Sequence, residues 1–207
     1  MHATSHTRTI LWYLCHAGGE NMELFFCPDL VNREDAYALL AHAVRQVYSL
    51  DSLPAIGRSE HGKPFFPDLP QLQFNLSHSG SFALCALDDS PMGVDIEAIR
   101  PHHPRLARRI CSPAELEWLN EQDDRHRVLL SLWTKKEARV KYTGTGLTVP
   151  IREIRVPFDE DAVLDGLHFR TLSSDGWVGA VCGHTLSTAF HTVSAAELKK
   201  LDTARNK

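Results

Sequence analysis

Two carboxylates stand two residues apart in an apolar segment, Gly93-Val94-Asp95-Ile96-Glu97. The segment has the pattern of a strand, in which alternate side chains project from the same face. Asp95 and Glu97 are therefore expected side by side, where each raises the pKa of the other unless a cation sits between them. Oxygen ligands favour Mg²⁺, and Mn²⁺ is also compatible. The alternative is a solvated acidic pair on an ordinary strand.

A third carboxylate, Glu137, is expected on the buried face of a helix. Apolar residues recur around it at helical spacing, at Leu129, Trp133 and Val140. A carboxylate on a buried stripe costs free energy unless it is paired or bound to a cation, and a helical pair with Lys141 contributes only about 0.3 to 0.5 kcal/mol. We therefore predict that Glu137 faces Asp95 and Glu97 as a third metal ligand. An ordinary surface ion pair is the alternative.

Two shorter segments carry groups suited to binding anions. In His61-Gly62-Lys63-Pro64, glycine permits a close backbone approach and proline stiffens the exit, so Lys63 is placed to hold a phosphate. Most such triplets, however, are plain turns. Ser77 and His78 end a strand pattern and can donate hydrogen bonds to a phosphate. A nucleophile and base pair is disfavoured because adjacent residues of a strand point apart, and a histidine that only satisfies its loop is the alternative.

The densest basic stretch of the chain contains four arginines, Arg100, Arg105, Arg108 and Arg109. In a chain of net charge −4, this stretch is the candidate docking surface for an acidic partner. The alternative is a solvated helix face, which is what runs of charged residues usually form. The net negative charge argues against a general nucleic-acid binder.

Composition places the chain among ordinary globular proteins. Its 207 residues suffice for one large domain or two small packed ones. No apolar run approaches the length of a membrane span and no secretory signal is visible, so a cytoplasmic protein with no membrane association is expected. The five cysteines are odd in number and widely spaced, which favours buried thiols over disulfides or a zinc site.

Hydrophobic periodicity predicts strands and helices in both halves of the chain. Strands are expected at residues 10–15, 74–79, 82–87, 93–97, 151–156, 167–172, 177–182 and 187–193. Helices are expected at residues 33–50, at 113–121, around Glu137 and after Ser194. An irregular connection is expected at 16–28, and an ordered loop rather than a strand at 57–70. Asn32 and Ser112 are the expected N-caps, and Gly144 is expected to end the Glu137 helix.

Four motifs follow one another in this chain: Gly62-Lys63-Pro64, Phe74-Asn75-Leu76-Ser77-His78-Ser79, Gly93-Val94-Asp95-Ile96-Glu97 and Trp133-Thr134-Lys135-Lys136-Glu137-Ala138-x-x-Lys141. Each motif alone is weak. In this order and spacing, the four together resemble the 4′-phosphopantetheinyl transferases of the surfactin-synthetase-activating type. The resemblance is close over about residues 57–156 and looser elsewhere.

The resemblance implies an α+β fold in which two similar α/β halves form a pseudo-dimer within one monomer. The N-terminal half would comprise residues 1–91 and the C-terminal half residues 92–207, packed as one unit with coenzyme A in the cleft between them. Mg²⁺ would bridge the pyrophosphate of coenzyme A and three carboxylates, those of Asp95, Glu97 and Glu137. The remaining contacts to coenzyme A would come from Arg33, Lys63, Pro64, Ser77, His78, Lys136 and Lys141.

The reaction implied by the resemblance is attack by a serine hydroxyl of an apo acyl or peptidyl carrier protein on the phosphorus that bears the pantetheine arm. Glu137 is the expected base, either directly or through a metal-bound water, and Lys141 would neutralise the negative charge that develops. Carrier proteins of fatty-acid, polyketide and peptide synthesis are acidic, so the four arginines become the expected docking surface. One departure is that residues 16–28 contain no Lys or Arg, where family members carry basic residues that meet the 3′-phosphate of coenzyme A. Arg33 is the nearest substitute.

Two other functions fit parts of the pattern. A Mg²⁺-dependent phosphohydrolase would use the same three carboxylates, with water as the nucleophile, on coenzyme A or a related pyrophosphate. A non-catalytic carrier-binding module would have kept only the fold. The presence of all three carboxylates together with Lys141 disfavours the binding module.

Overall fold

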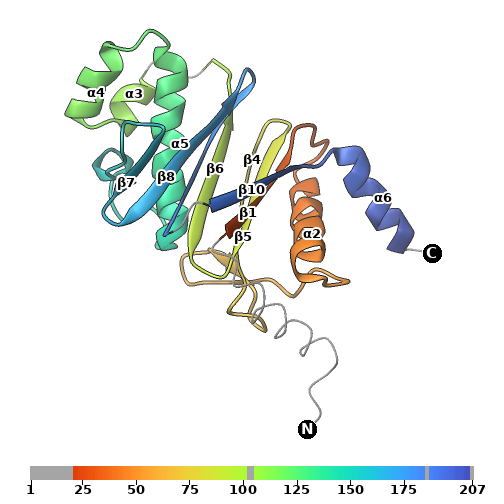
Figure 1. Ribbon diagram of the computed structural model, residues 1–207. Coiled ribbons are helices and arrows are strands. Elements are labelled where there is room, and N and C mark those ends of the chain that lie inside the picture. Colours follow the sequence, from red (N-terminus) through yellow and green to blue (C-terminus); the bar gives the residue numbers. More distant parts are fainter. Residues whose placement is uncertain (1–20, 102–104, 185–186, 206–207) are drawn as a thin grey trace.

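The computed structural model describes residues 21–101, 105–184 and 187–205, and these form a mixed α+β structure, as predicted (Figure 1). The strands are β1 (Asn21–Cys27), β2 (Gly57–Arg58), β3 (Pro64–Phe65), β4 (Gln73–Ser79), β5 (Phe82–Asp88), β6 (Met92–Ala98), β7 (Asp161–Leu164), β8 (Leu167–Ser174), β9 (Trp177–Gly183) and β10 (Ser187–Thr192). The helices are α2 (Asp35–Tyr48), α3 (Leu106–Ile110), α4 (Pro113–Asn120), α5 (Arg125–Thr143), the 3₁₀ turn η1 (Ile151–Glu153) and α6 (Ala195–Arg205). The strand predicted at residues 10–15 lies outside the described residues.

The first sheet has the strand order β10-β1-β5-β4. β5 pairs antiparallel with both β1 and β4, whereas β10 joins β1 in parallel, with His191 opposite Phe25. Helix α2 packs on one face of this sheet, and α6 lies beside α2 (Figure 1). The core on that face contains Phe25 and the α2 residues Leu39, Leu40 and Val44, which recur at the spacing predicted for one buried stripe.

The second sheet has the order β6-β9-β8-β7, with every neighbouring pair antiparallel. Helix α5 lies along β6 and β9, and α4 packs against α5 at the end of the molecule that also carries α3 (Figure 1). Leu132 and Ala138 of α5 pack against Phe169, Ala180 and Cys182 of the sheet. A third buried cluster, with Leu24 and Leu84 from the first sheet and Val94 and Val181 from the second, joins the two sheets.

The ends of α4 and α5 follow local sequence rules. Ser112 accepts a hydrogen bond from the Glu115 amide, and the Glu115 carboxylate accepts one from the Ser112 amide, which is the capping box that the sequence predicts. Asp124 caps α5 by accepting a hydrogen bond from the Arg127 amide at 3.0 Å. Gly144 ends α5 in the left-handed region, at φ +68°, as predicted.

Gly93 allows α5 to lie unusually close to β6. A Cβ at this position would overlap the carbonyl oxygen of Ala138 and would lie 2.6 Å from the amide nitrogen of Tyr142. Ala138 and Tyr142 belong to the helical turns that carry Glu137 and Lys141. The missing side chain therefore brings these two site residues within reach of β6.

Residues 21–27 form a strand, although the sequence predicted an irregular connection over residues 16–28. Met22 and Leu24 pack into the cluster between the sheets, while Phe25 and Cys27 pack under α2. Because both faces of β1 are buried, its sequence lacks the alternation of polar and apolar residues that marks a half-exposed strand.

Three other predicted elements were wrong. Residues 151–156 do not form a strand: Ile151–Glu153 is a 3₁₀ turn, and the Ile151 carbonyl accepts a hydrogen bond from Lys136. Asn32 is not the cap of α2, which begins at Asp35 after Glu34 without a side-chain cap. The short strands β2 and β3 pair within residues 57–70, which were predicted to be an ordered loop rather than a strand.

The C-terminal strand returns to the first sheet. β10 pairs with β1, so the first sheet contains residues from both ends of the described chain. The division into residues 1–91 and 92–207 stays a prediction. Among the described residues, the helices include none that is long and apolar enough to cross a membrane.

Candidate active site

Two pairs of side chains meet between β4 and β6, the facing edges of the two sheets. Ser77 Oγ donates a hydrogen bond to Asp95 Oδ1 at 2.8 Å, and Ser79 Oγ donates one to Glu97 Oε2 at 2.6 Å. The two-residue spacing is the same on both strands, so the carboxylates lie side by side on one face of β6, as the strand pattern predicts. We call Ser77, Ser79, Asp95 and Glu97 the polar seam.

Helix α5 covers the polar seam with three residues at four-residue intervals, Trp133, Glu137 and Lys141, which share one helix face. Trp133 Nε1 donates to Glu97 Oε1 at 3.3 Å. Lys141 Nζ donates to Asp95 Oδ1 at 2.7 Å. Because the residues on either side of Glu137 contact the two seam carboxylates, Glu137 lies over the pair.

The two oxygens of Asp95 differ in their contacts. Oδ1 accepts hydrogen bonds from Ser77 and from Lys141, which in turn donates to Ser77 Oγ at 2.8 Å, whereas Oδ2 is buried without a hydrogen-bond partner. Burial raises the pKa of Asp95, an effect that Lys141 and Ser77 oppose and Glu97 increases. A buried carboxylate oxygen without a partner is costly, and a bound cation would satisfy it.

Glu137 belongs electrostatically to the same group. It is half-buried, and burial raises its pKa; the charges of Asp95 and Glu97 raise it further, while Lys141 lowers it. Three mutually repelling carboxylates with oxygen donors fit a Mg²⁺ or Mn²⁺ ion in chemical type. Within the described part of the chain, however, no three His, Cys, Asp or Glu side chains are gathered closely enough to form a ready metal site.

Two cations lie close to His78, the residue that follows Ser77 on β4. Burial lowers the pKa of His78, and the positive charges of Arg33 and Lys141 lower it further, against a smaller opposing effect of Glu97. The imidazole is therefore neutral at pH 7. The structure thus brings Arg33, His78 and Lys141 into one positively charged neighbourhood beside the seam.

Lys63 reaches the same region from the turn before β3. Its Nζ donates to the carbonyl oxygen of Tyr142 at 3.0 Å, in the last turn of α5, and burial lowers its pKa. A cation is favourable at a helix C-terminus because the unpaired carbonyls there carry partial negative charge. Pro64 follows as the first residue of β3 and fixes the exit of the turn.

Arg58 is a candidate that sequence reasoning missed. It lies on β2, and its guanidinium donates to the Gly62 carbonyl at 3.1 Å and to the Tyr37 hydroxyl at 3.5 Å. These contacts place a second cation, Arg58, which is exposed, in the hairpin that carries the partly buried Lys63. A basic residue five positions before Lys63 in a Gly- and Pro-containing segment was the available sign.

Lys136 lies elsewhere than the resemblance implies. Its side chain is fully buried, and Nζ donates to Glu115 Oε2 at 2.7 Å, to the Ile110 carbonyl at 2.8 Å and to the Ile151 carbonyl at 3.2 Å. An ammonium has three hydrogens, and all three are used by protein oxygens. In this structure, Lys136 has no donor left for a phosphate, and the predicted contact with coenzyme A lacks structural support.

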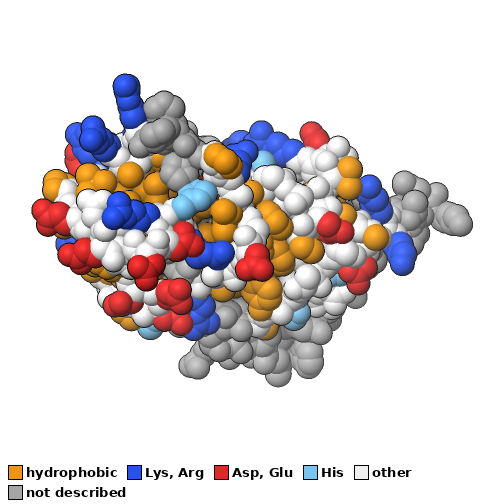
Figure 2. Space-filling view, turned by 90° about the horizontal axis from the view of Figure 1, so that it is seen from above, with side chains coloured by type: hydrophobic (Ala, Val, Ile, Leu, Met, Phe, Trp, Pro, Cys, Tyr) orange, Lys and Arg blue, Asp and Glu red, His pale blue; other side chains and the backbone are white. Residues whose placement is uncertain are grey.

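The four arginines of the basic stretch are all exposed. Arg105 is the N-cap of α3, and Arg108 and Arg109 lie in its last turn, while Arg100 follows β6. In the view of Figure 2, basic side chains (blue) occur at the left end of the molecule, the end that Figure 1 assigns to α3 and α4, with acidic side chains (red) among them.

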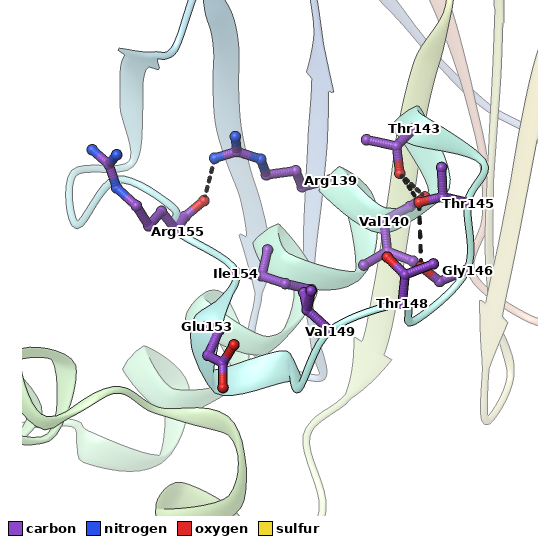
Figure 3. Close-up of a pocket in the computed structure, with 10 residues that line it drawn as sticks. All are labelled: Arg139, Val140, Thr143, Thr145, Gly146, Thr148, Val149, Glu153, Ile154 and Arg155. Carbon is purple, nitrogen blue, oxygen red and sulfur yellow. Dashed lines mark hydrogen bonds between the residues drawn. The ribbon is translucent and has the colours of Figure 1, made fainter.

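A pocket of about 260 Å³ opens on another face of α5 (Figure 3). It is lined by Arg139, Val140, Thr143, Thr145, Gly146, Thr148, Val149, Glu153, Ile154 and Arg155. Arg139 is engaged at its edge, where it donates to the Arg155 carbonyl at 2.6 Å and pairs with Asp165 at 2.8 Å. The lining contains none of the predicted site residues, so the candidate active site is the polar seam rather than this pocket.

Comparison with known sequences finds similarity to one class of proteins. Residues 91–182 match the sequence model of the 4′-phosphopantetheinyl transferase superfamily. The chain is 35% identical over 144 residues to a 4′-phosphopantetheinyl transferase of Bacillus subtilis, and 33% identical over 144 residues to 4′-phosphopantetheinyl transferase Sfp of Bacillus subtilis strain 168; each alignment covers 65% of this chain and 64% of the relative. It is 41% identical over 113 residues to 4′-phosphopantetheinyl transferase AcpT of Escherichia coli strain K12, covering 52% of this chain and 54% of the relative.

The chain thus spans slightly under two thirds of the length of the first two relatives. The matches confirm the resemblance predicted from the four motifs, to the 4′-phosphopantetheinyl transferases of the surfactin-synthetase-activating type.

Proposed function

We propose that this protein transfers the 4′-phosphopantetheine arm of coenzyme A to a serine of an apo acyl or peptidyl carrier protein, giving the holo carrier and 3′,5′-ADP. The observation that carries the proposal is the convergence of Asp95, Glu97, Glu137 and Lys141 on one seam, where a buried oxygen of Asp95 has no partner. The relatives named as transferases supply the reaction.

We further propose that coenzyme A lies along the junction of two similar halves that form a pseudo-dimer. The N-terminal half would contribute β1, β4 and β5 of the first sheet with helix α2, and the C-terminal half the second sheet with helix α5 and also β10, which completes the first sheet. β4 and β6 face each other at the junction. The N-terminal half would supply Arg33, Lys63, Pro64, Ser77 and His78 for the phosphates and adenosine. Arg58 joins this set, because it adds a positive charge in the hairpin of Lys63, whereas residues 16–28 contain no Lys or Arg.

Asp95, Glu97 and Glu137 are the residues that would hold Mg²⁺, or Mn²⁺ in its place. The ion would supply neutralisation of the pyrophosphate charge. Lys141 would neutralise further charge on the same phosphates. The Ser77 hydroxyl donates a hydrogen bond to Asp95 and accepts one from Lys141, which fixes the positions of both side chains. Lys136 is left out of the set because its ammonium is fully used elsewhere.

Glu137 is the residue that we assign as general base. It is a carboxylate on the face of α5 that covers the seam, where it can accept a proton from a hydroxyl group brought to the seam. It would take the proton from the carrier serine while the serine oxygen forms a bond to the phosphorus. The bond from that phosphorus to the 3′,5′-ADP oxygen breaks, and the leaving group departs with its electron pair.

Carrier proteins of the proposed class are acidic, and the exposed Arg100, Arg105, Arg108 and Arg109 offer the opposite charge. We propose that the carrier docks there. The monomeric state and a cytoplasmic location stay predictions. The phosphohydrolase alternative lacks support, because the relatives compared above are named as transferases.

The test of this function is incubation with coenzyme A, Mg²⁺ and a panel of apo carriers, with both products identified. Formation of a phosphopantetheinylated carrier with 3′,5′-ADP is the expected result. Release of free phosphopantetheine without a modified carrier would replace the transferase with the hydrolase.

A further inference from the structure

Lys136 precedes Glu137 in the same motif, yet the two side chains serve different parts of the structure. Consecutive helical residues point about 100° apart, so a residue next to Glu137 on α5 does not face the seam. The Lys136 side chain is fully buried, and its ion-pair partner Glu115 is only 4% exposed. Their ion pair, at 2.7 Å, is therefore a buried one rather than a surface contact.

The ammonium of Lys136 joins three separate segments to α5. It donates to the carbonyl of Ile110, which is the last residue of α3, and to the Glu115 carboxylate in the first turn of α4. It also donates to the carbonyl of Ile151 at the start of η1. The same Glu115 oxygen accepts from the Ser112 amide at 2.6 Å, so the ion pair and the cap of α4 share one atom.

Helix α3 is short, and apart from this bond it is held by packing of its apolar residues, Leu106, Ala107 and Ile110, against the core of the second sheet. It has only five residues, too few for a stable isolated helix, and the side chain of its N-cap residue does not cap the first turn. Ile110 is its one fully buried residue. Arg108 and Arg109 stand directly before Ile110, so the bond from Lys136 fixes the end of the helix that carries them.

We propose that Lys136 is a positioning residue for the docking surface: through Ile110 and Glu115 it fixes the arginines of α3 relative to the polar seam. The inference rests on the proposed function, because it gives α3 the role of meeting an acidic carrier. The proposal gives two adjacent residues of one motif, Lys136 and Glu137, different roles toward the two substrates, the carrier protein and coenzyme A. Glu137 acts where coenzyme A and the serine react, and Lys136 orients the surface that receives the carrier.

Lys136→Met tests the proposal, since methionine keeps an unbranched apolar side chain but loses the ammonium. The KM for carrier should rise roughly tenfold, which corresponds to about 1.4 kcal/mol of docking free energy. The KM for coenzyme A should stay unchanged. A rise in the KM for coenzyme A with an unchanged KM for carrier would overturn the proposal and return Lys136 to the phosphates.

Glu115→Gln is the reciprocal variant and covers the case that Lys136→Met does not fold, because losing one partner of a buried pair is often strongly destabilising. Glutamine can still accept the Ser112 hydrogen bond through its amide oxygen. The same selective rise in the KM for carrier is expected. No rise in this variant would contradict a positioning role. Val44→Ala creates a cavity between α2 and the first sheet, far from α3 in the chain, and is the control for loss of stability alone.

Amide hydrogen exchange provides a readout that is independent of any reaction. In Glu115→Gln and Lys136→Met, the amides of Arg109 and Cys111, bonded within and just after α3, should exchange faster. Lys135→Met is the matched control: Lys135 is equally buried but donates to the carbonyls of residues 157–159, so faster exchange should appear there instead. Unchanged exchange around α3 would overturn the proposal. If the wild type modifies no carrier, the proposed function fails while this readout still decides the positioning role.

Discussion

Glu137 carries an electrostatic cost in the protein without metal. It is half-buried beside Asp95 and Glu97, and burial together with their charges raises its pKa. A carboxyl group whose pKa is higher in the folded state binds protons more readily there than in the unfolded chain. The resulting loss of stability is therefore complete above the folded pKa, shrinks as the pH falls through the folded pKa, and is absent below the unfolded pKa.

Glu137→Gln should accordingly make the metal-free protein more stable than the wild type at pH 7, because glutamine is neutral at every pH. The difference in melting temperature between the two proteins should shrink toward zero in acid, where the wild-type Glu137 is protonated as well. Thermal unfolding in EDTA as a function of pH measures this difference. A variant less stable than the wild type at pH 7 would show that Glu137 is stabilised by a partner rather than strained by its neighbours.

Single residues show how far sequence reasoning reaches. The two-residue period of a strand was enough to place Asp95 and Glu97 side by side, and the helical period brought Glu137 to them. The helical period does not reveal which groups the adjacent side chain, that of Lys136, will contact. Lys136 was assigned to phosphate by its motif, whereas the structure gives its ammonium three protein acceptors from segments distant in sequence.

At the scale of elements, the site depends on how closely α5 approaches β6. Gly93→Ala places a methyl group against the Ala138 carbonyl, which is backbone and cannot rotate away. We expect a loss of about 1 to 3 kcal/mol or more in unfolding free energy, the usual cost of overpacking, together with loss of transfer. Chemical denaturation and a transfer assay measure the two effects.

Gly176→Ala is the control for Gly93→Ala. Its added Cβ would meet the tip of the Phe82 ring at 3.2 Å, where a side chain can shift, and Gly176 lies in the turn between β8 and β9. Stability and transfer should change little. Equal damage from both substitutions would show that close packing of α5 on β6 has no special role.

The elements that sequence reasoning found are those with a one-sided pattern or a local cap, such as α2 and the capping box of Ser112 and Glu115. The elements that it missed lack such marks. β1 is buried on both faces. β10 was predicted as a strand, but its pairing with β1, from the other end of the described chain, was not. Such a long-range pairing depends on the assembled sheet and leaves no local trace in composition or periodicity.

At the scale of the whole molecule, the docking prediction concerns charge. The protein has a net charge of −4, so attraction of an acidic carrier must come from a local basic surface. Arg108→Glu together with Arg109→Glu should raise the KM for carrier roughly tenfold or more and leave the KM for coenzyme A unchanged. The wild-type KM for carrier should also rise with ionic strength, more steeply than in the variant.

Lys199→Glu with Lys200→Glu is the matched control for charge reversal. Both lysines are exposed on α6, which lies at the opposite end of the molecule from α3 (Figure 1). This variant changes net charge by the same amount. If it raises the KM for carrier as much as the α3 variant does, the effect comes from net charge and the docking surface is contradicted.

The most direct test of the account is the intact mass of an apo carrier after incubation with coenzyme A and Mg²⁺, in parallel with wild type and Glu137→Gln. The account predicts that the carrier gains one phosphopantetheine with the wild type, and that replacing the acceptor serine with alanine abolishes the gain. The rate with Glu137→Gln should fall roughly 10²- to 10⁴-fold, the usual contribution of a general base. An unmodified carrier with the wild type, or an undiminished rate with Glu137→Gln, would contradict it.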